Sequence, residues 1–449
     1  MIERTVLEWQ SLSYSADATD PKAIPDWAAD RLAAVAKRSS LGGEEGAKIL
    51  QHGRTSLRAQ QVVGVIAAEG CTLEILPKID GLGDASHPQA LRSELIHMLA
   101  VALDLEIASD ALTSLGYQKE NLLEVLIGLF CDKLFAVVHR GLPRRYVGHE
   151  EDLPTLRGRL DVTRQFTTLA ASPAKLACRY DALSPDIALN RIMKAAVLRL
   201  SRLSRKPANQ RKLQELTFAF ADVADASVAA LRWDDVIIDR TNARWRELLR
   251  LARLLLGDRF QTTSRGPGEG FSLVFEMNAL FEEYVARMLS RALSGSGLTV
   301  HAQGGRLHCL REVLEGDLLG PGRFMTKPDV IVRKAGRAVM VLDTKWKRLS
   351  ARIDDRKQGV AQADIYQMMA YGRLYGCERL MLLYPHHDGI DGQEGILGRH
   401  RIADGPDELS IATIALNERA TVRARLAKLV QAIETHADPK DQASFSLAS

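Results

Sequence analysis

Two aspartates and a lysine lie beside short apolar runs, where they could bind a divalent cation and support hydrolysis of a phosphodiester bond. Asp343 and Lys345 follow the run AVMVL, and residues two apart in a strand project from the same face. Asp329 leads into a second run, VIV, and a hairpin between the runs would bring it beside Asp343. Burying charge costs free energy unless the charge is paired or binds a ligand. The alternative is a solvated ion pair at the end of a strand.

These residue types suit a magnesium site. Carboxylate oxygens are the hard ligands that Mg²⁺ prefers, so we predict Asp329 and Asp343 as metal ligands. Such a cation polarises a phosphoryl oxygen and lowers the pKa of bound water. Lys345 can orient the attacking water or neutralise charge that develops on the phosphate. Glu282, in the segment LFEEYV, is a candidate for a further metal ligand, with Glu283 as its competitor.

A helix is expected over residues 362–376, and its polar residues could face the same site. Asp364, Gln367 and Tyr371 are spaced i, i+3 and i+7, which places them on one side of a helix. There they could contact metal-bound water or the DNA backbone. The alternative is an ordinary solvent-exposed helix face.

The surrounding chain alternates helices and strands, which is typical of an α/β domain. After the glycine-rich break SRGPGEG, the pattern predicts a helix, strands, the hairpin, a second helix and a further strand. Before the break, two strand-like runs around Ala-Glu-Gly predict a hairpin within residues 56–79. We therefore expect three regions: a β-rich partner-docking region at 1–115, a mainly helical region at 116–263, and an α/β domain with a mixed sheet flanked by helices at 264–449.

Several motifs resemble known nucleases. KPDVIV…VLDTKWK is similar to the PD-(D/E)xK motif, and QADIYQMMAYG looks like the Q-x-x-x-Y element that follows it in several branches. FEMNALFEEYV, LDTKWK and DIYQMMAYG together resemble the McrC family, the nuclease subunit of McrBC-type, modification-dependent restriction systems. The resemblance implies a PD-(D/E)xK nuclease domain in which Asp329, Asp343 and Lys345 have the metal-binding and catalytic roles. It implies auxiliary catalytic roles for Gln367 and Tyr371.

The resemblance also implies partners. McrC-like proteins cut double-stranded DNA, generally modified DNA, when assembled with a ring-forming McrB-like AAA+ GTPase that they stimulate. This chain has no G-x-x-x-x-G-K-[ST] sequence, and GGEEGAK at 42–48 lacks the required spacing. Any nucleotide-driven motor is therefore expected to be a second protein.

Composition narrows the class of protein. The 449 residues carry a formal net charge of +4, which is compatible with nucleic-acid binding without demanding it. The five cysteines form no CxxC pair, which disfavours a zinc or iron–sulfur site built from neighbouring cysteines. The first residues lack a signal-peptide pattern, and no apolar run approaches the roughly 18 residues of a membrane span. A cytoplasmic protein without membrane contact is therefore expected.

Two other functions stay open. A RecB/Cas4-like DNA exonuclease would share the aspartate, D-x-K and Q-x-x-x-Y elements, although many such enzymes bind an iron–sulfur cluster through four cysteines. The other is a non-catalytic activator of a AAA+ GTPase with a vestigial nuclease pocket. The intact set Asp329, Asp343 and Lys345 argues against this second possibility.

Overall fold

The computed structural model divides the chain into two compact units. One unit contains residues 1–119 together with 264–449, and the other contains residues 120–263. By their contacts, the predicted regions 1–115 and 264–449 thus belong to one unit. The structure describes residues 2–17, 19–43, 46–82, 87–105, 121–172, 174–257, 270–313, 319–349, 359–390, 392–403 and 405–434. Among these residues, no helix has both the length and the apolar character needed to cross a membrane.

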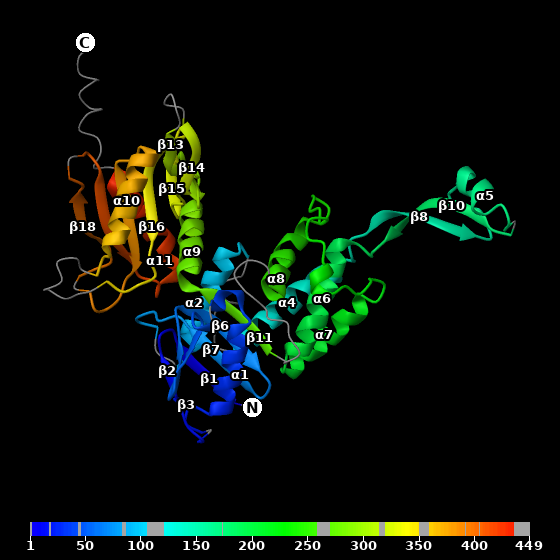
Figure 1. The fold of residues 1–449 in the computed structure, drawn as a ribbon, viewed down its shortest axis with the longest axis horizontal. Coiled ribbons are helices and arrows are strands. Elements are labelled where there is room, and N and C mark those ends of the chain that lie inside the picture. The colour runs from blue at the N-terminus through cyan, green and yellow to red at the C-terminus, as the bar shows by residue number, and fades with distance from the viewer. Residues whose placement is uncertain are drawn as a thin grey trace, which may run out of the picture. The chain divides into compact units, whose positions relative to one another are not determined.

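A six-stranded mixed sheet occupies the C-terminal part of the first unit (Figure 1). Its three inner neighbours β16, β17 and β19 are parallel, and the strands that flank them pair antiparallel. Parallel strands covered on both faces are typically continuous apolar runs, as VMVL and LMLLY are here. The strand order is β12 (Leu298–Ala302), β15 (Val330–Lys334), β16 (Arg337–Thr344), β17 (Arg379–Pro385), β19 (Glu408–Ile414) and β18 (Gly395–Arg401).

Helices cover this sheet. Met368 and Tyr371 of α10 (Gln362–Tyr375) pack in one core with Val341 and Leu382 of the sheet. α9 (Met277–Ala292) contacts β16 and β12, and α11 (Arg419–Glu434) contacts β19 and α9. Figure 1 shows α10 in front of the sheet and α11 behind it. The predicted mixed sheet flanked by helices is confirmed.

The N-terminal part of the first unit contains two four-stranded sheets that share a core with α1 (Asp26–Lys37). The hairpin predicted around Ala-Glu-Gly is present as β6 and β7, which pair antiparallel. One sheet has the order β1 (Ile2–Leu7), β7 (Cys71–Leu76), β6 (Val62–Ala68) and β11 (Gly270–Glu276). The other has the order β3 (Ala23–Ile24), β2 (Ser11–Tyr14), β5 (Ser56–Ala59) and β4 (Leu50–His52).

Strand β11 links the two parts of this unit. It follows the glycine-rich break in sequence but pairs antiparallel with β6, and α9 begins directly after it. Gly64 of β6 has φ of +135°, and a Cβ at this position would lie 1.9 Å from the carbonyl oxygen of Leu273. Only glycine permits this close approach of the two strands. α2 (Gln89–Ala102) also packs against α9, so the N-terminal residues support the helix beside the six-stranded sheet.

The second unit is mainly helical and carries a three-stranded sheet of order β8 (Arg145–Leu153), β10 (Leu176–Ser184) and β9 (Arg159–Leu160). Within this unit, β8 and β10 form a long arm (Figure 1). The buried Glu124 of the first helix accepts hydrogen bonds at 2.8 Å each from Ser204, which directly follows Leu203 at the end of the third helix, and from Asn209 of the fourth. The helices are α4 (Leu122–Val138), α5 (Val162–Thr167), α6 (Ala188–Leu203), α7 (Pro207–Ala219) and α8 (Arg246–Leu256).

Candidate functional site

The β15–β16 hairpin brings Asp329 and Asp343 to the same end of the six-stranded sheet. Its two-residue turn, Ala335–Gly336, has φ values of +48° and +83°, as a left-handed hairpin turn requires. The register pairs Val330 with Leu342, so each aspartate lies one residue beyond these paired positions. Asp343 is only 2% exposed. The hairpin expected from the sequence is therefore present, with both acids at its open end.

Asp329 is held in place by the residue that follows Asp343. Its Oδ2 accepts hydrogen bonds from the backbone N–H of Thr344 at 2.7 Å and from the Thr344 hydroxyl at 2.8 Å. Thr344 is itself fixed, because β16 continues to pair with β17 at this position. The orientation of the Asp329 carboxylate is therefore set by the neighbouring strand.

The ammonium of Lys345 lies between the strand end and helix α10. Its Nζ is 2.8 Å from Oδ2 of Asp343, 3.2 Å from Oε1 of Gln367 and 3.6 Å from Oδ1 of Asp364. The side-chain amide of Gln367 in turn donates to the hydroxyl of Tyr371 at 2.7 Å. The polar stripe predicted on this helix thus faces the two aspartates, and the structure brings all of its members into one chain of contacts.

Burial and mutual repulsion dominate the electrostatics of the acids. The pKa of Asp329 is raised to about 7 by burial and by the negative charges of Asp343 and Glu282, against the hydrogen bonds from Thr344. Burial also raises the pKa of Asp343, while the ammonium of Lys345 opposes this shift. Burial lowers the pKa of Lys345, but the nearby acids more than offset this and leave it raised. The site therefore favours an additional positive charge.

The carboxylate oxygens fit a divalent cation. Oδ2 of Asp343 is buried, and the ammonium of Lys345 lies 2.8 Å from it. In the described part of the chain, no three His, Cys, Asp or Glu side chains gather closely enough to hold a metal ion. Asp329 and Asp343 stay candidate ligands at the open end of the hairpin. Mg²⁺ is commonly held by one or two carboxylates, with waters and substrate phosphates as its other ligands.

Glu282 of α9 lies close enough to this pair to interact with it electrostatically. Burial raises the pKa of Glu282, and the charge of Asp343 adds to this effect. A hydrogen bond from Gln303 and the charge of Lys327 act in the opposite direction. The role of Glu282 as a further metal ligand stays a prediction.

Trp346, the residue after Lys345, is held by three side chains. The sequence analysis does not single out any of the three. The backbone N–H of Trp346 donates to Oδ1 of Asn278 at 2.9 Å. Its carbonyl accepts from Nε2 of Gln61 at 2.5 Å, and its indole N–H donates to Oε1 of Glu8 at 2.7 Å. Every polar group of this residue is therefore paired, and the backbone next to Lys345 cannot shift without breaking these bonds.

Trp346 belongs to the core. It is 5% exposed, and its ring packs edge-on against Phe281 of α9 with centroids 5.3 Å apart. Glu8 directly follows β1, and Gln61 directly precedes β6. The N-terminal residues thus help to shape the candidate site. No local pattern marks them, because their partner lies 338 and 285 positions away in the sequence.

The buried Glu8 leads to a prediction on stability. Burial raises its pKa to about 7 from the ordinary 4.5, so the folded chain binds a proton that the unfolded chain has lost between these pH values. The contribution of Glu8 to the free energy of unfolding is therefore fully present below pH 4.5 and is lost as the pH rises through 7. We expect the stability advantage of the wild type over Glu8→Gln to fall by on the order of 2 kcal/mol across this window.

Urea unfolding at a series of pH values, without divalent cations, measures this difference. Glutamine retains an acceptor for the indole N–H of Trp346 but does not titrate, so a change in the difference with pH isolates the carboxyl group. Parallel stability curves for the two proteins would contradict the prediction.

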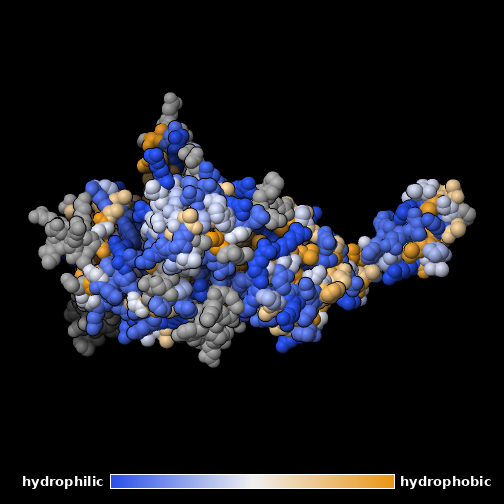
Figure 2. Space-filling model, turned by 90° about the horizontal axis from the view of Figure 1, so that it is seen from below, coloured by the Kyte–Doolittle hydropathy of each residue, from blue (hydrophilic) through white to orange (hydrophobic). Residues whose placement is uncertain are grey.

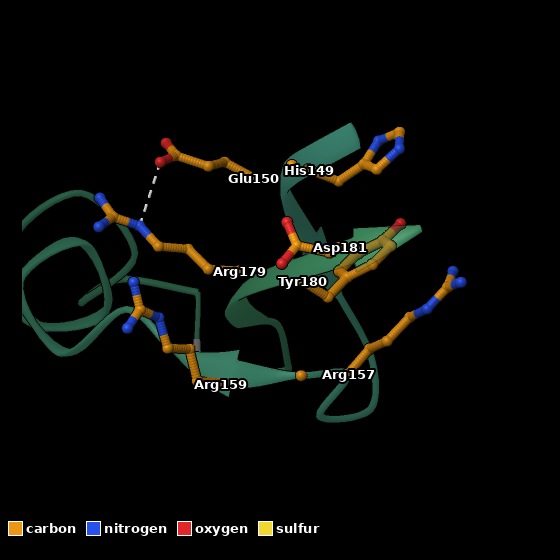
Figure 3. Close-up of a pocket in the computed structure, with 9 residues that line it drawn as sticks. His149, Glu150, Arg157, Arg159, Arg179, Tyr180 and Asp181 are labelled. Atoms are coloured by element: carbon orange, nitrogen blue, oxygen red, sulfur yellow. Dashed lines mark ion pairs between the residues drawn. The ribbon is translucent and has the colours of Figure 1, made fainter. Parts of the chain in front are cut away.

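A separate hollow lies on the sheet of the second unit. Its volume is about 900 Å³, and Figure 3 shows it lined by side chains from β8, β9 and β10. Arg179 pairs with Glu150 at 3.1 Å and with Asp161 at 2.6 Å. The guanidinium of Arg157 lies 4.0 Å from the ring centroid of Tyr180. These charged groups have partners within the unit, which makes the hollow a polar surface feature.

Comparison with known proteins places this geometry in context. A chain in the refined half-complex from a tetradecameric assembly of Thermococcus gammatolerans McrB AAA+ hexamers with bound McrC is similar in structure. It is 22% identical, with a TM-score of 0.67 over 96% of this chain and 100% of that chain. A chain in the cryo-EM structure of the Thermococcus gammatolerans McrBC complex is 26% identical, with a TM-score of 0.52 over 65% of this chain and 88% of that chain. No curated protein sequence matches.

A family model gives the assignment. The model described as "McrBC 5-methylcytosine restriction system component" matches residues 57–385. This range includes Asp329, Asp343, Lys345 and the polar residues of α10. The family resemblance inferred from the motifs is confirmed, and the chain belongs to the family of McrBC 5-methylcytosine restriction system components.

Proposed function

We propose that this chain is a Mg²⁺-dependent DNA endonuclease of the PD-(D/E)xK type and the cleaving subunit of a McrBC-like restriction system. The observation that carries the proposal is the meeting of Asp329, Asp343 and Lys345 at one end of the six-stranded sheet. A buried and a half-buried carboxylate, both with raised pKa values, and an adjacent ammonium suit a divalent cation and a phosphate. Family membership supports the same reaction.

Each residue of the candidate site would have a distinct role in hydrolysis. Asp329 and Asp343 would hold Mg²⁺, which, when bound, polarises a phosphoryl oxygen and acidifies water. Lys345 would contact a non-bridging oxygen of the scissile phosphate and stabilise the charge that develops on it. Gln367 holds the lysine ammonium through Oε1, and Tyr371 keeps the Gln367 amide in this orientation. Because its pKa is raised, Lys345 acts as a cation and not as a base.

We further propose that cleavage requires a McrB-like AAA+ GTPase ring, which this chain stimulates and which selects modified double-stranded DNA. A similar structure contains McrB AAA+ hexamers with bound McrC. The second unit exposes large apolar side chains, including Tyr146 at 75% and Phe166 at 74%, of the kind that a protein partner covers. The chain lacks a nucleotide-binding loop of the P-loop type, so the motor belongs to the partner.

Reconstitution tests this function. We expect a covalently closed plasmid containing 5-methylcytosine to be cut only when the chain, a McrB-like partner, GTP and Mg²⁺ are all present. We also expect no GTP turnover by the chain alone and a several-fold rise in the partner's turnover when the chain is added. Released phosphate and agarose gels report the two reactions. Robust GTP hydrolysis by the purified chain would contradict the assignment of the motor to a second protein.

The same assay separates the alternatives. An exonuclease would degrade linear DNA from its ends and leave the closed circle intact. A non-catalytic activator would raise GTP turnover without cutting either form. Cutting of the closed circle into a discrete linear product excludes both.

A further inference from the structure

A two-stranded ribbon lies directly before Asp329 in the chain and has no cover from the rest of the described protein. It consists of β13 (His308–Val313) and β14 (Leu319–Met325), which pair antiparallel. Every residue of the first strand is exposed, as are most residues of the second. The ribbon stands out from the surface as a narrow projection of mixed hydrophobic and hydrophilic atoms (Figure 2).

The exposed side chains of the ribbon include large apolar residues and arginines. An isolated hairpin with this much exposed apolar surface is marginally stable in water, so a partner is expected to cover it. Residues 306–327 contain four arginines and lysines against three acids, Glu312, Glu315 and Asp317. The exposed large apolar side chains are Leu307 at 43%, Leu310 at 57%, Val313 at 67%, Leu319 at 61%, Phe324 at 72% and Met325 at 55%.

The base of the ribbon is fixed to the same helix that faces the candidate site. The hydroxyl of Thr326 donates to the carbonyl of Leu307 at 2.7 Å and lies 2.8 Å from the hydroxyl of Tyr375 in α10. Gly305 has φ of +96°, and a Cβ there would lie 2.3 Å from the Tyr375 ring. From Thr326 only two residues remain before Asp329. The base of the ribbon is therefore close to Asp329 in the chain and is fixed to the helix that faces the candidate site.

Phe324 has an unusual backbone for a bulky residue. Its φ of +56° lies in the left-handed region, which is strained for a residue with a large side chain, and its ring is 72% exposed. Arg323 and Met325 flank it, and Arg323 makes an exposed ion pair with Glu312 at 3.2 Å. Exposed ion pairs contribute little, so this arginine can exchange its partner for a phosphate.

We propose that the β13–β14 ribbon lies in a groove of double-stranded DNA beside the cleavage site, with its arginines on phosphates and Phe324 against the bases. The inference rests on the proposed nuclease function. A two-stranded ribbon fits a DNA groove, and apolar side chains such as phenylalanine insert between base steps at kinks. The place of the ribbon favours DNA over a second copy of the chain, because its base is fixed to α10 and lies just before Asp329 in the chain.

The test uses the full chain and a fluorescein-labelled blunt DNA duplex in EDTA, where binding proceeds without cleavage. Anisotropy is measured over a range of salt concentrations. The double variant Arg311→Ala/Arg323→Ala is expected to lower the slope of log Kd against log salt by about two, since each lost phosphate contact lowers it by about one. The matched control is Lys334→Ala/Arg337→Ala, which removes the same charge at the far end of the β15–β16 hairpin. Its slope is expected to equal that of the wild type.

Insertion of the ring is tested with a duplex that carries 2-aminopurine, whose fluorescence rises when it unstacks. We expect the wild type to raise this fluorescence and Phe324→Ala to abolish at least half of the rise. Because the ring is exposed, the variant should unfold in urea as the wild type does.

The outcomes separate this inference from the function on which it rests. An unchanged salt slope in the arginine variant, with cutting as in the wild type, overturns the ribbon proposal and leaves the nuclease function intact. Loss of self-association in sedimentation, with unchanged DNA binding, identifies the ribbon as a contact between copies and also overturns it. A wild-type assembly that shows the expected slope difference but never cuts DNA overturns the nuclease function alone.

Discussion

Replacing Asp343 with alanine is expected to abolish DNA cleavage by the assembled system, a loss of at least about 10³-fold. The carboxylate is 2% exposed, and together with Asp329 at the open end of the hairpin it offers the oxygen ligands that Mg²⁺ prefers. Without it, the remaining carboxylate, Asp329, cannot hold Mg²⁺ in the same place. Gel assays on closed circular DNA measure the loss.

Folding and partner binding should survive this change. A buried carboxylate is costly to desolvate, so its removal is expected to alter the free energy of unfolding by no more than about 1 kcal/mol. Urea unfolding and co-elution with the GTPase partner check this. Asp364→Ala is the matched control, because Asp364 also contacts Lys345 but lies on the helix; it is expected to keep activity within about tenfold of the wild type. Full cutting by the Asp343 variant would refute the assignment.

Replacing Lys345 with methionine is expected to lower the rate of cleavage by about 10²- to 10³-fold, with little change in DNA affinity. Methionine keeps most of the side-chain volume but removes the ammonium that lies 2.8 Å from Asp343. The variant should lower the rate of the chemical step, because the ammonium of Lys345 stabilises negative charge that develops on the phosphate in the transition state. Single-turnover cleavage rates and anisotropy separate the rate from the affinity.

Lys347→Met is the matched control for this prediction. Lys347 lies two residues away in the same segment, and its ammonium pairs with Asp364 at 2.5 Å. The control is expected to stay within about fivefold of the wild-type rate, as suits the loss of one partly exposed ion pair. Equal losses in both variants would show that general positive charge, and not the position of Lys345, supports the reaction.

The local part of the site can be predicted from the sequence. Asp329, Asp343 and Lys345 sit on a hairpin whose two strands are adjacent in the chain, so period-two alternation and one turn suffice to bring them together. The stripe on α10 follows from helical periodicity in the same way. Each inference needs only the geometry of one or two neighbouring elements.

The long-range part could not be predicted, for a physical reason. Glu8, Gln61 and Asn278 are brought to Trp346 by tertiary structure, and single polar residues carry no periodic pattern. The pairing of β11 with β6 has the same origin. The sequence therefore suggests a boundary near 264–270, whereas contacts place residues on both sides of the middle unit in one body.

The shared sheet and the bonds to Trp346 bear on how such genes can recombine. A chimera that joined residues 270–434 to a foreign N-terminal half would leave the seven paired positions of β11 without their partner strand. It would also leave the indole of Trp346 with no acceptor for its buried N–H. We therefore expect the middle unit, residues 120–263, to be exchangeable as a module. The two flanking segments, 1–119 and 264–449, are expected to be exchangeable only together, because they form one unit.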